Sequence, residues 1–243
     1  MNLYDFNING FIGSKNNVEL FDHTDTALAM RKIVVNSDML GIDRSLLTDN
    51  KTYSNRESTL KFKIKANNVD EMNSRYIGFF NAINKGSYVL ANFYYDPAYQ
   101  YQIFCTGIKP TTTNHNFMFN RVYEVTISAA PFKYLIDAPS VSFGTTSTTI
   151  TNKTSFNSKP HIKITGSGDI TLTVNGTKFS FIGVTGSIEL DSSLQTVYRM
   201  DAGKAVNENS KMKIGPFPEL KPGKNTISVS SGTAVIEPRW RTL

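Results

Sequence analysis

Reactive residue types are scarce in this sequence of 243 residues. It holds a single cysteine, Cys105, so an internal disulfide framework is excluded. Cys105 stands between Phe104 and Thr106 in an apolar strand pattern, which is typical of a small buried side chain rather than a reactive thiol. No phosphate loop, nucleophile elbow or cysteine–histidine pairing occurs, and none of the three histidines belongs to a spaced ligand pair. We therefore expect no catalytic residue, no metal and no cofactor.

Long apolar runs are also missing. No stretch approaches the ~20 apolar residues of a transmembrane helix. The first residues, Met1–Phe6, have neither the basic segment nor the apolar segment of a secretory signal. We therefore expect a protein that is made in a cytoplasm and has no membrane partner.

The net charge of +6 and the sequence pI of about 9.2 could suggest a nucleic-acid partner. The lysines and arginines are scattered, however, and no basic run interleaves with aromatic residues. No specific nucleic-acid binding is expected.

The chain is long enough for two ordinary domains, each with its own core. Pro131 lies in the segment Ala129–Tyr134 and ends a run of strands, because proline cannot continue a central strand. The composition then shifts to Thr, Ser and Asn over residues 143–158. We predict a mainly β protein with an α+β first domain at 1–134 and a second domain at 135–243.

The first domain is predicted to hold one helix, between Asn68 and Asn84. Asn68 can cap it, Glu71 stands at the capping-box offset, and Gly86 can follow its end in the left-handed conformation. Apolar residues then repeat at helical spacing: Met72, Tyr76, Phe79, Phe80 and Ile83. We interpret this stripe as core.

Strands surround the predicted helix. An opening hairpin is expected near Phe6–Gly13 and a β-branched strand at Ile33–Val35, followed by a polar segment, Asn36–Asn55. After the helix, the strand candidates Tyr88–Tyr95, Tyr101–Gly107 and Phe119–Ser128 would form one antiparallel sheet system, with a loop at Lys109–Asn116.

Lysines alternate with apolar residues over Thr59–Ala66. A period of two places Lys61, Lys63 and Lys65 on one strand face. The stripe is either a basic interface facing a partner subunit or a lumen, or the solvated face of an amphipathic strand.

The last third of the chain predicts a β-sandwich. Alternating runs at Ile170–Val174 and Phe179–Ile182 flank Asn175-Gly176, and both turn residues tolerate the positive φ of a two-residue hairpin. The acids Glu189 and Asp191 share a strand face; they are interpreted as a wet side rather than as a glycosidase pair.

The sole tryptophan, Trp240, lies between Arg239 and Arg241. Aromatic and arginine clusters anchor protein interfaces, which makes the three residues a candidate interface. The alternative is a last strand that tucks Trp240 into the sandwich. Pro238 could break that strand and let the final residues pack back on the first domain.

Five short motifs follow one another from residue 168 to residue 241: Gly-Asp before a strand and Asn-Gly, Ile-Glu-Leu-Asp-Ser, Gly-Pro-Phe-Pro-Glu-Leu, Pro-Gly-Lys-Asn-Thr-Ile and Ile-Glu-Pro-Arg-Trp-Arg. In order and spacing they resemble the carboxyl half of the distal tail proteins, the hub proteins of long non-contractile phage tails. The resemblance implies a tail-tube-like β-sandwich with one helix and a hairpin arm, followed by a galectin-like or jelly-roll β-sandwich.

The resemblance also implies a function. A distal tail protein is a structural virion protein of the tail tip that forms a hexameric ring. Its partners are the tail tube protein, the tail-tip protein and the receptor-binding proteins. A competing hypothesis is that the second domain is a carbohydrate-binding module for host cell-wall sugar, with Tyr198 and Arg199 as the candidate contacts.

Overall fold

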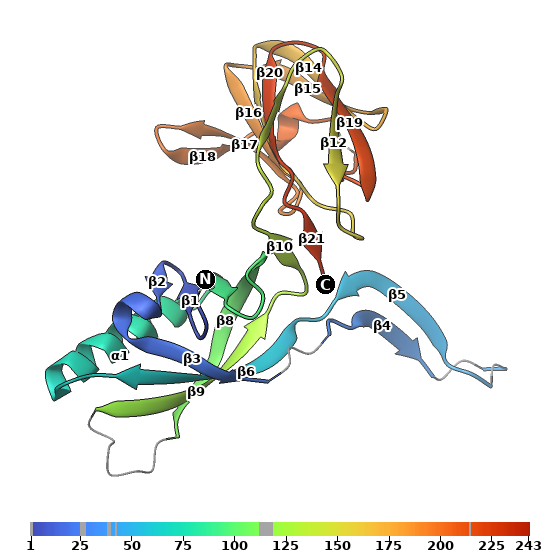
Figure 1. Ribbon diagram of the computed structural model, residues 1–243. Coiled ribbons are helices and arrows are strands. Elements are labelled where there is room, and N and C mark those ends of the chain that lie inside the picture. The colour runs from blue at the N-terminus through green and yellow to red at the C-terminus, as the bar shows by residue number, and fades with distance from the viewer. Residues whose placement is uncertain (1, 25–27, 38–39, 42, 112–118, 214) are drawn as a thin grey trace. The chain divides into compact units, whose positions relative to one another are not determined.

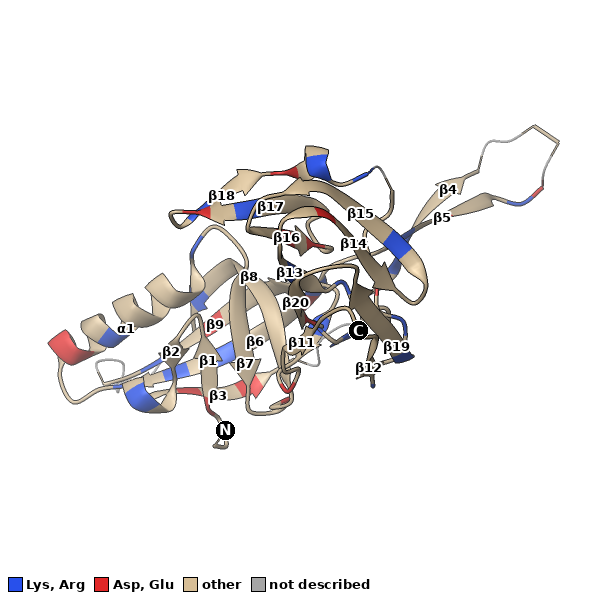
Figure 2. Cartoon of the chain, turned by 90° about the horizontal axis from the view of Figure 1, so that it is seen from above, with Lys and Arg blue, Asp and Glu red and all other residues tan. Residues whose placement is uncertain are grey.

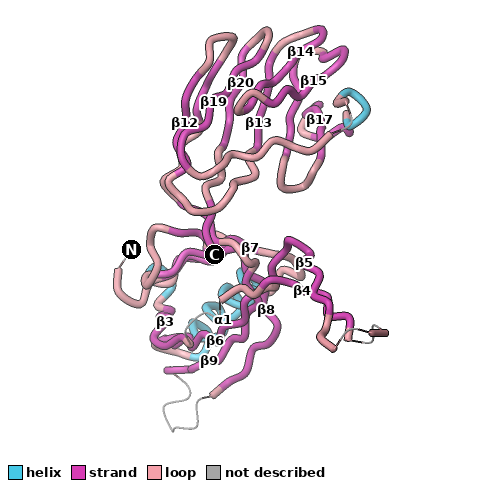
Figure 3. The backbone as a smooth tube through the Cα atoms, turned by 90° about the vertical axis from the view of Figure 1, so that its right-hand side faces the viewer, coloured by secondary structure: helices cyan, strands magenta, loops and turns pink. Residues whose placement is uncertain are grey.

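The computed structural model describes residues 2–24, 28–37, 40–41, 43–111, 119–213 and 215–243. The chain divides into two compact units, one of residues 1–133 with residue 243, and one of residues 134–242. Strands dominate both units, and among the described residues α1 is the one α-helix (Figure 3). No helix in these ranges is long and apolar enough to cross a membrane.

The first unit is a twisted antiparallel sheet with a helix and a separate hairpin (Figure 1). Its elements are β1 (Phe6–Ile8), β2 (Phe11–Ile12), β3 (Val18–His23), β4 (Arg31–Asn36), β5 (Leu46–Tyr53), β6 (Arg56–Lys65), α1 (Val69–Ile83), β7 (Val89–Phe93), β8 (Tyr99–Pro110) and β9 (Asn120–Ala129). The strand order in the sheet is β2-β1-β7-β8-β9-β6-β3. Strand β8 is longer than predicted and runs into the expected loop; residues 112–118 of that region, His115 included, lie outside the described residues.

The core of the first unit forms where β6 meets α1. The predicted alternation is confirmed, since Leu60, Phe62 and Ile64 are fully buried. On the helix, Phe79 is also fully buried, with its ring 4.7 Å from that of Phe62. Aromatic pairs at such distances add about 0.5–1.5 kcal/mol to the burial of their area. Helix and sheet are therefore held together by an aromatic cluster.

The predicted helix start is confirmed as well. The side chain of Asn68 accepts a hydrogen bond of 2.8 Å from the backbone N–H of Glu71. The Glu71 carboxylate accepts in return from the backbone N–H of Asn67, at 2.7 Å. The N–H of Glu71 is one of the donors that the first helical turn leaves without a partner, and the N–H of Asn67, just before the cap, is satisfied as well.

Strands β4 and β5 form a two-stranded sheet of their own. Strand β4 contains the β-branched run that was predicted, but β5 lies within the supposed polar segment Asn36–Asn55, which is a correction. The central residues of β5, Asp49, Asn50 and Lys51, have low strand propensity, so the pairing with β4 sets their conformation.

The second unit is a β-sandwich. Its strands are β11 (Val141–Phe143), β12 (Thr148–Asn152), β13 (His161–Thr165), β14 (Gly168–Val174), β15 (Thr177–Val184), β16 (Ser187–Asp191), β17 (Thr196–Asp201), β18 (Lys204–Asn207), β19 (Gly223–Val229) and β20 (Thr233–Glu237). The short strands β10 (Lys133–Leu135) and β21 (Arg241–Thr242) pair with each other and belong to neither sheet of the sandwich. Two sheets, ordered β11-β20-β13-β16-β17-β18 and β12-β19-β14-β15, share one apolar core.

The central hairpin of the sandwich has the predicted turn. Val174 pairs with Thr177, which leaves two residues in the loop, Asn175 at φ 50° and Gly176 at φ 81°. Positive φ at both positions is the requirement of the primed turn that matches the twist of the strands.

Candidate interaction surfaces

The β4–β5 hairpin, called the arm below, presents an apolar face that the described part of the chain leaves uncovered. Ile33 and Val35 share one face of β4, and Val35 pairs with Leu47 across the hairpin. The exposed fractions of Ile33, Val35 and Leu47 are 47%, 58% and 62%. Contiguous exposed apolar side chains of this kind mark interaction sites.

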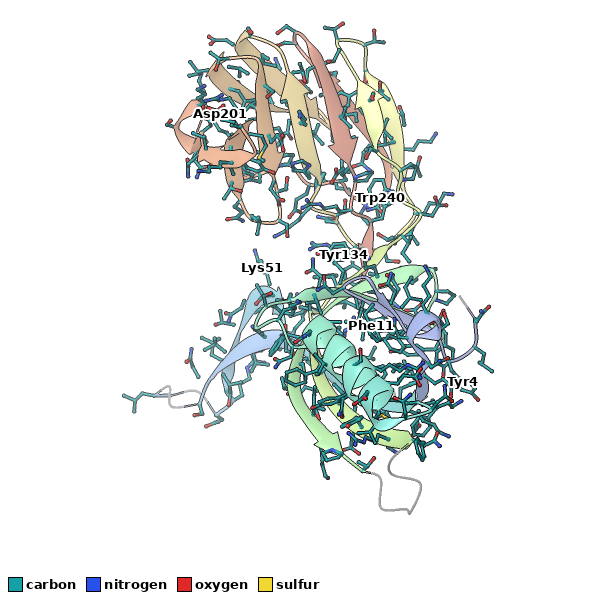
Figure 4. The ribbon with its side chains drawn as sticks, turned by 90° about the vertical axis from the view of Figure 1, so that its left-hand side faces the viewer. Tyr4, Phe11, Lys51, Tyr134, Asp201 and Trp240 are labelled. Carbon is teal, nitrogen blue, oxygen red and sulfur yellow. The ribbon has the colours of Figure 1, made fainter. Side chains whose placement is uncertain are left out.

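Polar contacts fix the middle of the arm. Arg31 forms an ion pair with Asp49, and Asp49 also accepts the backbone N–H of Lys51 at 2.8 Å. These two groups, the N–H of Lys51 first, lower the pKa of Asp49 below its ordinary value. Lys51 has a φ of 57° beside an irregularity in the pairing, and it is labelled on the arm in Figure 4.

The lysine stripe on β6 is partly neutralised by its neighbouring strand. Lys61 is 2.7 Å from Asp22, and Lys65 forms an ion pair with Glu19. Asp22 and Glu19 belong to β3, and Figure 2 shows acidic residues among the basic ones in this part of the sheet. Lys63 lies between the two pairs, opposite Glu19. This pairing favours a solvated strand face over a basic interface.

The three residues at 239–241 are engaged within the second unit. Trp240 is only 7% exposed and belongs to the sandwich core. Arg239 donates from Nη1 to Asp191 at 2.8 Å, and Arg241 donates from Nε to the carbonyl oxygen of Asn157 at 2.7 Å. Of the two alternatives for Trp240, the structure favours the tucked side chain over the interface anchor.

The two acids of β16 are buried, which corrects the expectation of a wet side. Glu189 and Asp191 are 7% and 4% exposed although they lie on the outer face of their sheet. His161 covers Glu189, with its Nε2 3.2 Å from the carboxylate and 3.1 Å from the Tyr198 hydroxyl. Burial, and then the carboxylate of Glu189, raise the pKa of Tyr198.

Asp191 is held as a carboxylate. Burial alone would raise its pKa, but the backbone N–H groups of Leu194 and Ser193 and the guanidinium of Arg239 hold that pKa below its usual value. Each of these groups stabilises the charged form. The side chain therefore anchors the turn after β16 and the last residues of the chain.

The candidate sugar contacts Tyr198 and Arg199 are not brought together. They are neighbours on β17, so their side chains leave opposite faces of the sheet. The guanidinium of Arg199 lies 3.4 Å from Asp201 and 3.5 Å from Glu208. Asp201 is labelled in Figure 4, at the turn between β17 and β18.

Sequence reasoning missed a groove in the second unit. Its volume is about 520 Å³, and its lining residues come from four separate segments: Lys159, residues 174–179, residues 192–195 and residues 215–221. Such a site leaves no local signature, because only the folding of the sandwich assembles it.

A sheet with one helix and an arm, followed by a β-sandwich, is a fold that this chain shares with chains of phage hub and baseplate structures. One similar solved structure is that of the SPP1 Dit protein (gp 19.1), a paradigm of the hub adsorption apparatus in phages that infect Gram-positive bacteria. The TM-score is 0.67 at 13% sequence identity, over 97% of this chain and 98% of that one.

The baseplate of phage p2 in its activated conformation contains a second similar chain. Its TM-score is 0.53 at 10% identity, over 96% of this chain and 97% of that one. No protein-family model matches the sequence, and no curated protein matches it. The mainly β fold with one helix that the motif resemblance implies is thus confirmed, and this chain shares it with the SPP1 Dit chain and the p2 baseplate chain.

Proposed function

We propose that this protein is the distal tail hub of a phage, a structural virion protein at the tail tip. Six copies form a closed ring that continues the tail tube. In this proposal, residues 1–134 form the ring and residues 135–243 form a galectin-like β-sandwich domain. The ring binds the tail tube protein on one side and the tail-tip protein on the other, and it carries the receptor-binding proteins.

The uncovered apolar face of the arm carries this proposal. A two-stranded hairpin is marginally stable by itself in water, and an exposed apolar strand pair invites aggregation unless a partner covers it. Ring contacts are heterologous, so the arm of one copy must meet a different surface of the next copy. An arm that projects from a compact unit can reach a different surface of the neighbouring copy, as a heterologous contact requires.

The likeness to hub and baseplate chains over almost the whole length supports the same proposal. Both units are matched together, so the likeness is not that of a common sandwich alone. A hub lies between the tail tube and the adsorption apparatus, so the tail tube protein, the tail-tip protein and the receptor-binding proteins are its proposed partners.

The direct test is the native mass of the purified protein, measured by light scattering over a range of concentrations and salt. We expect a hexamer, and its mass should be insensitive to salt because apolar burial drives the contact. Strict monomer at every concentration, together with no assembly on isolated tail-tube ends, would refute the ring.

A further inference from the structure

The groove in the second unit has the composition of a binding site for a polar ring. Its apolar wall is made by Val174, Phe179 and Phe217, and Phe217 is half-buried. Polar side chains surround this wall: Lys159, Thr177, Gln195, Glu219 and Lys221. A volume of about 520 Å³ lies within the range of small-molecule sites.

A buried hydroxyl in the groove lacks a partner. Ser192 lines the groove and is 1% exposed, yet its Oγ has no hydrogen-bond partner among the described atoms. Its backbone N–H is satisfied by the carbonyl oxygen of Pro160, at 3.1 Å. An unsatisfied buried polar group costs about 1–3 kcal/mol. A ligand hydroxyl that reaches the groove floor would remove this cost.

The wall of the groove is held in place before any ligand arrives. Asn225, which is fully buried, accepts the backbone N–H of Lys221 and donates to its carbonyl oxygen, each at 2.8 Å. Asn175 donates to the same Asn225 side chain, also at 2.8 Å. Gln195, which also lines the groove, has a φ of 54°, in the left-handed region.

The charges on the rim favour an anion. Neither Lys159 nor Lys221 forms an ion pair within the described ranges. The one acid, Glu219, already accepts a hydrogen bond of 2.9 Å from Asn157. The groove therefore presents two cations against one partly engaged carboxylate.

We propose that this groove binds a saccharide that carries a negative charge. The apolar face of the sugar ring packs on Phe217, and a hydroxyl group bonds with the Oγ of Ser192. The carboxylate or phosphate of the saccharide lies between Lys159 and Lys221. The inference is independent of the ring, since every residue it uses belongs to the sandwich.

The test uses the full chain on an array of immobilised trimers of galacturonate, of phosphorylated mannose and of unmodified galactose. We expect the acidic trimers to be retained over the neutral one. The retained trimer is then titrated calorimetrically, with uridine monophosphate as a competitor that also offers a ring and an anion. Retention of no trimer, or tighter binding of the nucleotide, would overturn the proposal.

Variants locate the site. Ser192→Ala and Phe217→Leu should each weaken binding at least tenfold, and Lys221→Gln should abolish the preference for the acidic trimers. The matched controls are Ser193→Ala, next to the groove, and Lys178→Gln, on the same hairpin; both should bind as the unchanged chain does.

Folding and binding are read separately. Ser192→Ala removes a hydroxyl without a partner, so the Tm should stay constant or rise while binding weakens. This variant keeps the test decisive even where Phe217→Leu unfolds the sandwich. Unchanged affinity in Ser192→Ala, or an equal loss in Ser193→Ala, refutes the site. Light scattering on the same samples should show an unchanged oligomer, which separates this outcome from a failure of the ring.

Discussion

Removing the apolar face of the arm should prevent ring assembly without unfolding the subunit. The double variant Val35→Ser with Leu47→Ser changes two side chains that pair across the hairpin. Neither contributes to the core of the first unit, because both are mainly exposed. The arm is paired only to itself, so the sheet order behind it stays the same.

The magnitude follows from the exposed area. Full burial of a Val or Leu side chain contributes about 1.5–3 kcal/mol. Val35 and Leu47 are 58% and 62% exposed, so burying this exposed area in a ring contact should stabilise the contact by about 2–3.5 kcal/mol for the pair. Each contact of the ring should therefore weaken roughly 30- to 400-fold. A closed ring repeats the loss at every contact, so monomer should replace the ring at micromolar concentration.

Light scattering measures the oligomer, and thermal unfolding measures the subunit. The matched control is Ile182→Ser with Val235→Ser, which removes two exposed strand residues from the second unit. We expect the control to assemble normally, and we expect both double variants to keep the Tm of the unchanged monomer within a few degrees. A ring of undiminished affinity in the arm variant would refute the argument that the arm's apolar face forms the contact.

Three further predictions concern stability. Gly176→Ala should lower the free energy of unfolding by about 1–2 kcal/mol, because the φ of Gly176 is 81°. Gly232→Ala should lower it by about 1–3 kcal/mol more, because the added Cβ would lie 2.2 Å from the backbone oxygen of Thr165. Equal losses of the two variants in urea unfolding would contradict this prediction. The pKa of Asp191 is lower in the folded than in the unfolded protein, so its charge stabilises the fold at neutral pH, and this stabilisation is lost as the pH falls below about 4. Asp191→Asn should make the free energy of unfolding less dependent on acid pH, as measured by the fluorescence of the single tryptophan. An unchanged pH profile would count against the contact with Arg239. Asn68→Ala should lower the free energy of unfolding of the first unit by about 1 kcal/mol, and no loss in urea titration would mean that the cap is not needed.

Local patterns in the sequence were enough for several elements. The capped helix that begins after Asn68, the alternation of Leu60, Phe62 and Ile64, and the Asn175-Gly176 hairpin each depend on residues close together in the chain. Backbone preferences and side-chain periodicity act over these short distances, so a single sequence reveals them. The motif order of the last third then indicated the two-part fold that the structural comparisons share.

Contacts between distant segments decided the rest. Strand β5 continues through Asp49, Asn50 and Lys51, which have low strand propensity, because β4 supplies the hydrogen bonds. Glu189 and Asp191 alternate like solvent-facing acids, yet His161 and Arg239, which come from other segments, cover them. The residues that line the groove around Ser192 come from four separate segments, so no spacing of residues in the sequence predicts the groove. Periodicity determines which way a side chain points, whereas only tertiary packing determines what it meets there.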